Sequence, residues 1–203
     1  MRVGVFGGTF DPVHLGHLII AEQCREQASL DQVWFIPAAR PPHKQDRQLT
    51  PFGQRVEMLQ LATAGHGAFR VDELEKDRPG LSFTADTLEE LRRRHADAEF
   101  FLLIGADCLP DLPHWHEPAR IVDAATLLIV ARPGWTLWPA ERLRTALKLS
   151  PDKQFRHVVV PMPLIDVSST DLRRRVAEGR SIRYFTPRAV ECYIENHRLY
   201  QLF

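Results

Sequence analysis

The stretch RVGVFGGTFDPVHLGH, residues 2–17, determines the expected fold of this chain. It begins as a β-branched strand over residues 2–6, and Gly7 and Gly8 follow at the strand exit. Glycine has no Cβ, so backbone N–H groups at these positions can approach a ligand closely. An apolar helix pattern comes next, and the N-terminus of a helix offers unpaired N–H groups and a positive dipole end to anions. The stretch therefore predicts a phosphate site between a strand and a helix.

Polar side chains in and near this stretch are candidates for the phosphate site. His14 and His17 are three residues apart, on one face at the start of the expected helix. An isolated pair of this kind is more often a helix cap, but the GGTFDP sequence before it favours contact with phosphates. For Asp11 we expect a role in capping the turn rather than in arranging a metal or a substrate. Lys44 follows two prolines and a histidine on a stiff loop, which holds its ammonium group ready for a phosphate.

Beyond residue 17, segments with the patterns of strands and helices alternate. Several strand candidates are continuous apolar runs, which suits strands covered on both faces. The expected strands are residues 33–37, 69–74, 99–104, 126–131 and 157–160, and the expected helices are residues 18–28, 51–64, 84–94 and 139–147. Thr50 is expected to cap the second of these helices, with Pro51 at its first position. The alternation predicts a doubly wound, mostly parallel α/β sheet that binds ligands at the carboxyl ends of its strands.

The end of the chain has a different pattern, which predicts two helices. The run Ser168-Ser169-Thr170-Asp171 is expected to cap a basic helix over residues 172–178, which Gly179 ends. A second helix is expected over residues 187–197. We interpret residues 168–203 as a helical C-terminal segment packed on the α/β body, so that residues 1–203 form a single domain.

The composition argues against several classes of protein. Lys+Arg and Asp+Glu each count 26 among 203 residues, so the net charge is zero, which argues against a broad nucleic-acid surface. Cys24, Cys108 and Cys192 are scattered and form no CxxC, as expected for reduced thiols. No apolar run approaches the roughly 18 residues needed to span a bilayer. We therefore expect a cytoplasmic protein that binds neither nucleic acid nor membrane, and the sequence leaves its oligomeric state open.

Five motifs in order carry a resemblance to a known family. After GGTFDPVHLGH come PPHK at residues 41–44, SFTADTL at 82–88, GAD at 105–107 and SSTDLRRR at 168–175. The chain resembles the nucleotidyltransferase superfamily with an H-x-G-H motif, and within it bacterial nicotinate mononucleotide adenylyltransferase, from Met1 to about Tyr200. The resemblance implies a Rossmann-like nucleotidyltransferase fold. It also implies transfer of the adenylyl group of ATP to nicotinate mononucleotide, which gives deamido-NAD and pyrophosphate.

This resemblance also implies roles for individual residues. The expected catalytic residues are His14, His17, Lys44 and Arg173. The implied contacts with ATP come from Gly7, Gly8, Thr9, Phe10, His14, His17, Gly105, Asp107, Ser168, Ser169, Thr170 and Arg173. The implied contacts with nicotinate mononucleotide come from Lys44, Ser82, Phe83, Thr84 and Trp115.

The chemistry of this transfer fits such a set of residues. Attack of a mononucleotide phosphate on the α-phosphorus of ATP needs little proton transfer, because the nucleophile is already an anion. Catalysis then consists mainly of positioning and of stabilising charge on the phosphates. Mg²⁺ is the expected cofactor. We expect ATP and water to carry it, because no carboxylate cluster in the sequence forms an all-protein metal site.

The choice of acceptor is expected to depend on residues 82–87 and Trp115. A helix that opens at Ser82 offers N–H groups to a pyridine carboxylate, and a neutral amide gains less from the helix dipole. Trp115 matches the family tryptophan that stacks on the nicotinate ring. The run His116-Glu117-Pro118 departs from the family, which usually has a second aromatic residue and an acidic stretch here. Nicotinamide mononucleotide therefore stays an alternative acceptor. Pantetheine phosphate is less favoured, as is a protein that binds nucleotides without turnover.

Overall fold

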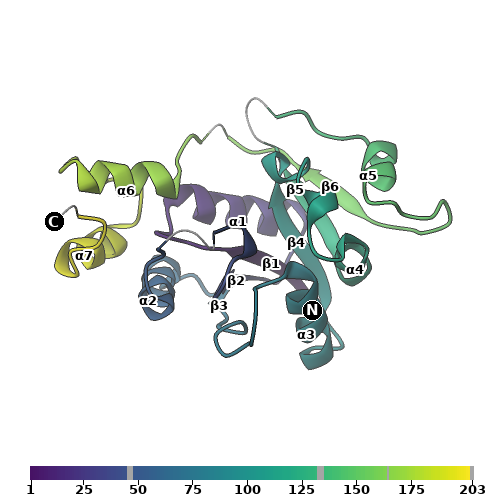
Figure 1. The fold of residues 1–203 in the computed structure, drawn as a ribbon, viewed down its shortest axis with the longest axis horizontal. Helices are drawn as coiled ribbons and strands as arrows, with labels where there is room; N and C mark the ends of the chain where they lie inside the picture. The colour runs from purple at the N-terminus through teal and green to yellow at the C-terminus, as the bar shows by residue number, and fades with distance from the viewer. Residues whose placement is uncertain (45–47, 132–134, 164, 202–203) are drawn as a thin grey trace.

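Six parallel strands form a sheet in the order β3-β2-β1-β4-β5-β6 in the computed structural model, which describes residues 1–44, 48–131, 135–163 and 165–201 (Figure 1). The strands are β1 (Arg2–Gly8), β2 (Gln32–Pro37), β3 (Phe69–Val71), β4 (Glu99–Gly105), β5 (Thr126–Val130) and β6 (His157–Val160). This order reverses direction between β1 and β4, as in doubly wound sheets that bind nucleotides at that point. The expected fold class is confirmed.

The helices lie between the strands in the chain and cover the sheet. They are α1 (Leu15–Gln27), α2 (Phe52–Thr63), α3 (Thr84–Arg94), α4 (Pro118–Ala124), α5 (Ala140–Ala146), α6 (Ser169–Ala177) and α7 (Arg188–Asn196), with short 3-10 turns at η1 (Pro42–Lys44), η2 (Ala106–Cys108) and η3 (Leu112–His114). The C-terminal helices α6 and α7 lie at one end of the molecule, away from α4 and α5 at the other (Figure 1). None of the described helices is long and apolar enough to cross a membrane.

Alternating strand residues build one hydrophobic core on each face of the sheet. In β4, Phe101 and Leu103 belong to the core that also contains buried residues of α1, α2, α6 and α7. Phe100, Leu102 and Ile104 belong to the opposite core, under α3, α4 and α5. Successive side chains of a strand point to opposite faces, so a continuous apolar run is needed to fill both cores.

The register of β1 explains why the sheet opens at its centre. The pairing of β1 with β2 continues to Gly8 opposite Pro37. The pairing of β1 with β4 ends at Val5 opposite Leu102, although both strands run on for three more residues. The two strands therefore separate at their carboxyl ends, which leaves room for a ligand between them.

Several expected element boundaries were wrong, and one helix was missed. Helix α1 begins at Leu15 rather than residue 18, because the glycine turn ends directly at His14. Pro51 itself caps α2 with an extended backbone, so Thr50 is not its N-cap. Strand β3 has only three residues: the Asp72 N–H still donates to the Phe35 carbonyl, and the chain enters a turn at Leu74. Helix α4 was not expected, because seven residues are too few to show a clear helical period. Gly179, with φ of +67°, does end α6 as expected.

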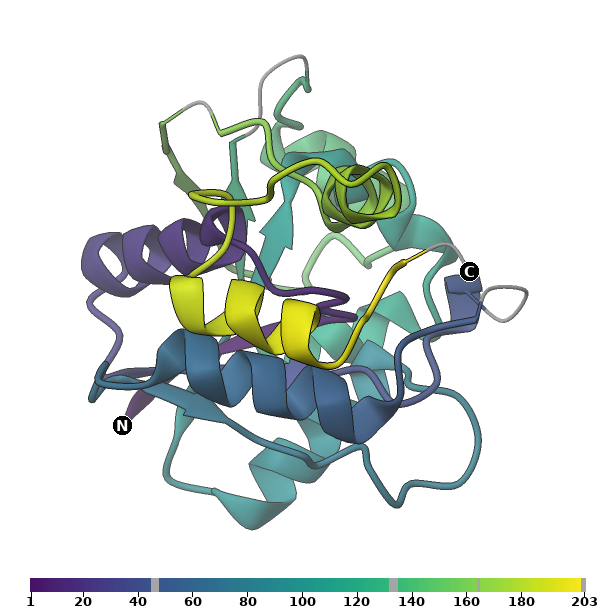
Figure 2. The same ribbon diagram turned by 90° about the vertical axis from the view of Figure 1, so that its left-hand side faces the viewer.

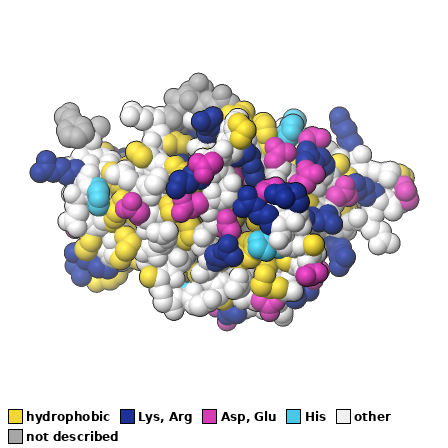
Figure 3. Space-filling view, turned by 90° about the horizontal axis from the view of Figure 1, so that it is seen from below, with side chains coloured by type: hydrophobic (Ala, Val, Ile, Leu, Met, Phe, Trp, Pro, Cys, Tyr) yellow, Lys and Arg dark blue, Asp and Glu magenta, His cyan; other side chains and the backbone are white. Residues whose placement is uncertain are grey.

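Charged side chains of both signs are interleaved on the face of the molecule shown in Figure 3. This pattern agrees with the equal numbers of acidic and basic residues in the sequence.

Helix α7 lies along α2 (Figure 2), and a tyrosine in this contact gives the fold a sensitivity to alkaline pH. The Tyr193 hydroxyl donates to Glu57 Oε2 at 2.7 Å. Burial, together with the Glu57 carboxylate, raises the pKa of Tyr193 to about 12. An unfolded chain loses this proton near pH 10, so the stabilising effect is fully present below about pH 10 and is lost as the pH rises toward 12.

We therefore expect the free energy of unfolding to fall between about pH 10 and pH 12, and to fall less in a Tyr193→Phe variant. Urea titrations of both proteins at pH 9 and pH 11 measure this difference. Equal losses in the two proteins would show that Tyr193 does not carry the effect.

Candidate functional site

A cavity of about 630 Å³ lies where β1 and β4 separate. The ends of these strands form its floor, and the segments that follow β1, β2 and β4 form its walls, together with the start of α3. Many of the sequence-predicted site residues line it: Gly7, Gly8, Thr9, Phe10, His17, Lys44, Ser82, Phe83, Thr84, Gly105, Asp107 and Trp115. The fold thus brings residues from four separated motifs to one site at the carboxyl ends of the strands.

The two glycines at the β1 exit differ in what surrounds them. A Cβ built on Gly8 lies 2.9 Å from the Phe10 ring, which is itself buried and has a positive φ of 49°. A Cβ built on Gly7 meets nothing within 4 Å, because it points into open space. Gly8 is therefore needed for packing, whereas Gly7 keeps the wall of the cavity bare so that a ligand can approach the backbone.

Lys44 lies against the glycine turn, although it comes from a different segment. Its Nζ donates to Thr9 Oγ1 at 2.7 Å. The contact holds the ammonium group at the cavity wall, where it supplies a positive charge beside the backbone N–H groups of the turn.

The two histidines form a stacked pair at the start of α1. Their ring centroids are 3.7 Å apart and their planes differ by 24°. The backbone N–H of His14 donates to the ring Nδ1 of His17 at 3.2 Å, so a neutral His17 carries its proton on Nε2. Only His17 of this pair lines the cavity; His14 is 4% exposed and lines a small crevice with Gly16 and Val167. A Cβ on Gly16 would lie 3.0 Å from His14 Nδ1, so glycine here makes room for the stacked rings.

Asp11 is buried beside the cavity rather than exposed in it. Its carboxylate accepts a hydrogen bond from the Tyr200 hydroxyl at 2.6 Å and a longer one from the Thr50 N–H at 3.4 Å. Burial and the Asp11 charge raise the pKa of Tyr200, which keeps the phenol protonated. Instead of capping its own turn, Asp11 joins this turn to the start of α2 and to the C-terminal end of the chain.

Arg55 on α2 supports the site and was missed in the sequence. Its side chain is 1% exposed and donates to the carbonyl oxygens of Thr9 (2.8 Å), Ala38 (2.9 Å) and Thr50 (2.9 Å). Burial lowers the pKa of Arg55, and the nearby Asp11 carboxylate opposes this shift. The guanidinium joins the β1 and β2 exit segments. Its signal in the sequence was an arginine on the face of the expected helix that also carries Met58 and Leu59.

The start of α6 lies against the histidine turn and outside the residues that line the cavity. Ser168 Oγ accepts from the Asp171 N–H at 3.1 Å and caps the helix. Ser169 Oγ donates to the Pro12 carbonyl at 2.8 Å, and Arg173 Nη1 donates to the Asp11 carbonyl at 2.6 Å. The structure thus places the second expected anion site, residues 168–173, next to the first one, with Arg173 in contact with its backbone.

The other end of the cavity contains the residues expected to contact a pyridine. Ser82 is joined to the β2 exit segment: its Oγ accepts from the Arg40 N–H at 2.9 Å, and its N–H donates to the Arg40 carbonyl at 2.9 Å. Helix α3 begins at Thr84, as expected, with Phe83 as its N-cap, and Ser82 directly precedes the cap. At the departure from the family pattern, the His116 ring stacks on Phe83 with a centroid distance of 4.2 Å.

Among the described residues, few carboxylates line the cavity, and no group of three potential metal ligands lies wholly within its lining. Glu75 and Asp107 are the acidic residues among the described lining residues. Next to the cavity, Asp86, His116 and Glu117 bring potential metal ligands together, and His116 also lines the cavity. Arg120 forms ion pairs with both carboxylates of that group and with Glu89, so one guanidinium already neutralises part of their charge.

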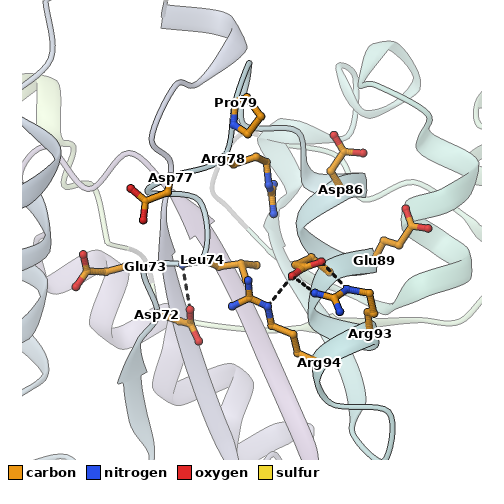
Figure 4. Close-up of a pocket in the computed structure, with 11 residues that line it drawn as sticks. Asp72, Glu73, Leu74, Asp77, Arg78, Pro79, Asp86, Glu89, Arg93 and Arg94 are labelled. Atoms are coloured by element: carbon orange, nitrogen blue, oxygen red, sulfur yellow. Dashed lines mark hydrogen bonds and ion pairs between the residues drawn. The ribbon is translucent and has the colours of Figure 1, made fainter.

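A second hollow, of about 800 Å³, lies between the segment after β3 and helix α3 (Figure 4). Among its charged residues, Arg93 and Arg94 pair with Glu90. Four other acidic lining residues pair with basic residues outside the lining: Asp72, Glu73, Asp86 and Glu89. None of the sequence-predicted site residues lines it. The hollow is therefore a charged surface feature separate from the cavity.

The fold and the site together define a class of protein. A parallel sheet in the 3-2-1-4-5-6 order, with a glycine turn, a histidine pair and basic residues at its switch point, is the arrangement of an α/β nucleotidyltransferase. Residues 5–175 match the model of the family described as cytidylyltransferase-like.

Individual relatives give the branch of that family. The chain is 48% identical over 200 residues to a protein of Thermomicrobium roseum named "Probable nicotinate-nucleotide adenylyltransferase", an alignment that covers 98% of this chain and 92% of the relative. A protein of Thermus thermophilus with the same name is 48% identical over 203 residues, which covers 99% and 100%. The chain belongs to the nicotinate-nucleotide adenylyltransferase family.

A solved structure has the same fold at low sequence identity. Plasmodium falciparum nicotinic acid mononucleotide adenylyltransferase complexed with NaAD superposes with a TM-score of 0.79 at 19% identity, covering 98% of this chain and 97% of that one. At this identity the likeness concerns the fold.

Proposed function

We propose that this chain transfers the adenylyl group of ATP to nicotinate mononucleotide, giving nicotinate adenine dinucleotide and pyrophosphate, with the cavity between β1 and β4 as the active site. The observation that carries the proposal is the convergence on this cavity of the glycine turn, His17, Lys44 and the start of α3. The turn and the basic groups suit phosphates, and the helix start with Trp115 suits a pyridine carboxylate. The family membership supports the same reaction.

In the proposed mechanism the residues position charge rather than move protons. A phosphate oxygen of the mononucleotide forms a bond to the α-phosphorus of ATP, and the bond from that phosphorus to the bridging oxygen breaks as pyrophosphate leaves. His17 and Lys44 stabilise the charge that develops on the phosphates. His14 holds His17 by ring stacking, and Arg173 is the further cation beside the turn. Gly105 and Asp107, at the end of β4, are the proposed contacts for the nucleoside of ATP.

Mg²⁺ is the proposed cofactor, and the donor set of the cavity fits an ion that arrives with ATP. The described lining contains two carboxylates, Glu75 and Asp107, too few for an all-protein metal site, so ATP and water would hold most of the ion's coordination sites. The ion would neutralise negative charge on the phosphates. As part of the same proposal, the reaction takes place in the cytoplasm, where the free thiols of Cys24, Cys108 and Cys192 stay reduced.

The test is pyrophosphate release from ATP and Mg²⁺ with nicotinate mononucleotide and nicotinamide mononucleotide compared side by side. A clear preference for the acid supports the proposal. Equal rates, or a preference for the amide, would keep the adenylyl chemistry and reject the proposed pyridine site. If no pyrophosphate is released with either acceptor or with pantetheine phosphate, the result favours a protein that binds nucleotides without turnover.

Gly7→Ala is expected to raise KM for ATP by about tenfold and to change the free energy of unfolding by less than about 0.5 kcal/mol. The added methyl group meets no protein atom within 4 Å but occupies the wall at which ATP phosphates are proposed to bind. Initial rates at varied ATP and urea titrations measure the two effects. Gly8→Ala is the matched comparison: its methyl group meets the Phe10 ring, so it should lose stability. An unchanged KM in Gly7→Ala would contradict the proposed ATP position.

A further inference from the structure

Two buried polar residues in the wall of the cavity have no part in the mechanism described above. Glu75 is 6% exposed and Thr87 is 4% exposed, and both line the cavity near Phe83 and Thr84. Burying a carboxylate in the wall of a site for two anionic substrates is unfavourable unless its charge is balanced and its oxygens are hydrogen-bonded. Their arrangement therefore calls for a functional explanation.

The two residues belong to a short series of hydrogen bonds that crosses the wall of the cavity. Thr87 Oγ1 donates to Glu75 Oε1 at 2.5 Å and accepts from Arg78 Nη1 at 2.7 Å. The other carboxylate oxygen, Glu75 Oε2, accepts from the Ala39 N–H at 3.4 Å. Arg78 reaches Thr87 from outside: it lines the charged hollow of Figure 4 and is absent from the cavity lining.

These hydrogen bonds connect the two segments that form the pyridine end of the cavity. Ala39 belongs to the β2 exit segment, which also pairs with Ser82 through Arg40. Thr87 lies in the first turn of α3, where its N–H donates to the Phe83 carbonyl at 3.1 Å. Fixing Thr87 therefore fixes the direction of the first helical turn, and with it the segment from Ser82 to Thr84.

We propose that Thr87, held between Glu75 and Arg78, is a positioning residue that sets the affinity of the site for the pyridine mononucleotide and leaves that for ATP unchanged. The inference rests on the proposed function and deepens it. Arg55 interacts electrostatically with Glu75, and Arg78 donates to the Thr87 hydroxyl that Glu75 accepts from, so the carboxylate can lie in the wall without repelling the acceptor. The residues proposed to bind ATP phosphates, on the β1 turn and α1, make no hydrogen bond to Thr87 or Arg78 among those described.

The test separates positioning from direct contact by two substitutions. Thr87→Val removes the hydroxyl on the cavity side. Arg78→Met removes the guanidinium on the side of the outer hollow. In the described hydrogen bonds, Thr87 is the one cavity-lining residue to which this guanidinium donates. Both are expected to raise KM for nicotinate mononucleotide by about tenfold, with KM for ATP and kcat within about twofold of the wild type. Thr87→Ser keeps the hydroxyl and should restore the wild-type KM.

Matched controls exist for both substitutions. Thr63 on α2 is a buried threonine whose hydroxyl donates to the Leu59 carbonyl, so Thr63→Val loses a similar group far from the cavity. Arg93 lines the same outer hollow as Arg78 but pairs with Glu90, so Arg93→Met tests the loss of a cation there. Both controls should keep both KM values, and thermal melts identify any variant that does not fold.

The outcomes distinguish this inference from the proposed function. If the wild type releases pyrophosphate with nicotinate mononucleotide but Arg78→Met resembles Arg93→Met, the positioning role is wrong and the function stands. The role is also wrong if Thr87→Val raises KM for ATP as much as KM for the acceptor, or if Thr87→Ser does not restore the acceptor KM. If the wild type releases no pyrophosphate with any acceptor, the proposed function itself fails.

Discussion

Replacing His17 by alanine is expected to lower kcat for adenylyl transfer by about 100- to 1,000-fold, which corresponds to about 2.7–4 kcal/mol of lost transition-state stabilisation. His17 is the member of the stacked pair that lines the cavity. Its Nδ1 accepts the backbone N–H of His14, and in the proposed mechanism its Nε2 N–H is the donor to the phosphates. A donor that acts on charge formed in the transition state affects kcat more than KM. Initial rates with both substrates varied measure the split.

The same side chain also caps α1, so the experiment needs a variant that keeps the cap. His17→Asn places an amide oxygen near the position of Nδ1, where it can accept the His14 N–H, but it has no group at the position of Nε2. We expect this variant to regain any stability lost in the alanine variant while its kcat stays low. Full turnover in either variant would show that His17 is not the phosphate donor.

Replacing Arg55 by methionine is expected to lower the free energy of unfolding by about 3–5 kcal/mol, the largest stability effect among our predictions. The guanidinium is 1% exposed and serves three backbone carbonyl oxygens. Methionine fills much of the volume but leaves these oxygens, and the nearby Asp11 carboxylate, without their cation. Each buried acceptor that loses its partner costs about 1–3 kcal/mol. Urea titration measures the change in the unfolding midpoint.

A surface arginine provides the control for this substitution. Arg92 on α3 is exposed and donates to the Asp123 carbonyl at 3.0 Å, so Arg92→Met loses one solvated hydrogen bond. Its expected change in unfolding free energy is within about 0.5 kcal/mol. If Arg55→Met were as stable as Arg92→Met, the three carbonyl contacts would not hold the exit segments of β1 and β2 in place.

Much of the fold was predictable because it depends on local patterns. Continuous apolar runs predicted β4 and β5 almost to the residue, since strands covered on both faces need apolar side chains in both directions. Helix α3 was predicted with its observed bounds, because its apolar residues repeat with a helical period. The three-residue β3 and the seven-residue α4 are shorter than the windows in which such periods can be recognised.

The candidate site was predictable in its composition but not in its geometry. The glycine turn, the histidines and the basic residues are adjacent in the sequence or fall in compact motifs, so their chemistry is visible there. Which of them line the cavity is not visible in the sequence. His17 lines it and His14 does not, because His14 precedes the helix as its N-cap and its buried ring stacks on that of His17. The hydrogen bonds of Glu75, Thr87 and Arg78 likewise depend on how α3 packs.

The sequence by itself determined the order of the strands, most of the helices and the family of the chain, and it predicted a phosphate site at residues 7–17, because each follows from neighbouring residues. The tertiary structure was needed for the cavity, which exists because the pairing of β1 with β4 stops at Val5 while both strands continue. It was also needed for the contact of Tyr200 with Asp11, 189 residues apart in the chain. Contacts over such separations depend on packing of the whole sheet and its helices, which no local pattern encodes.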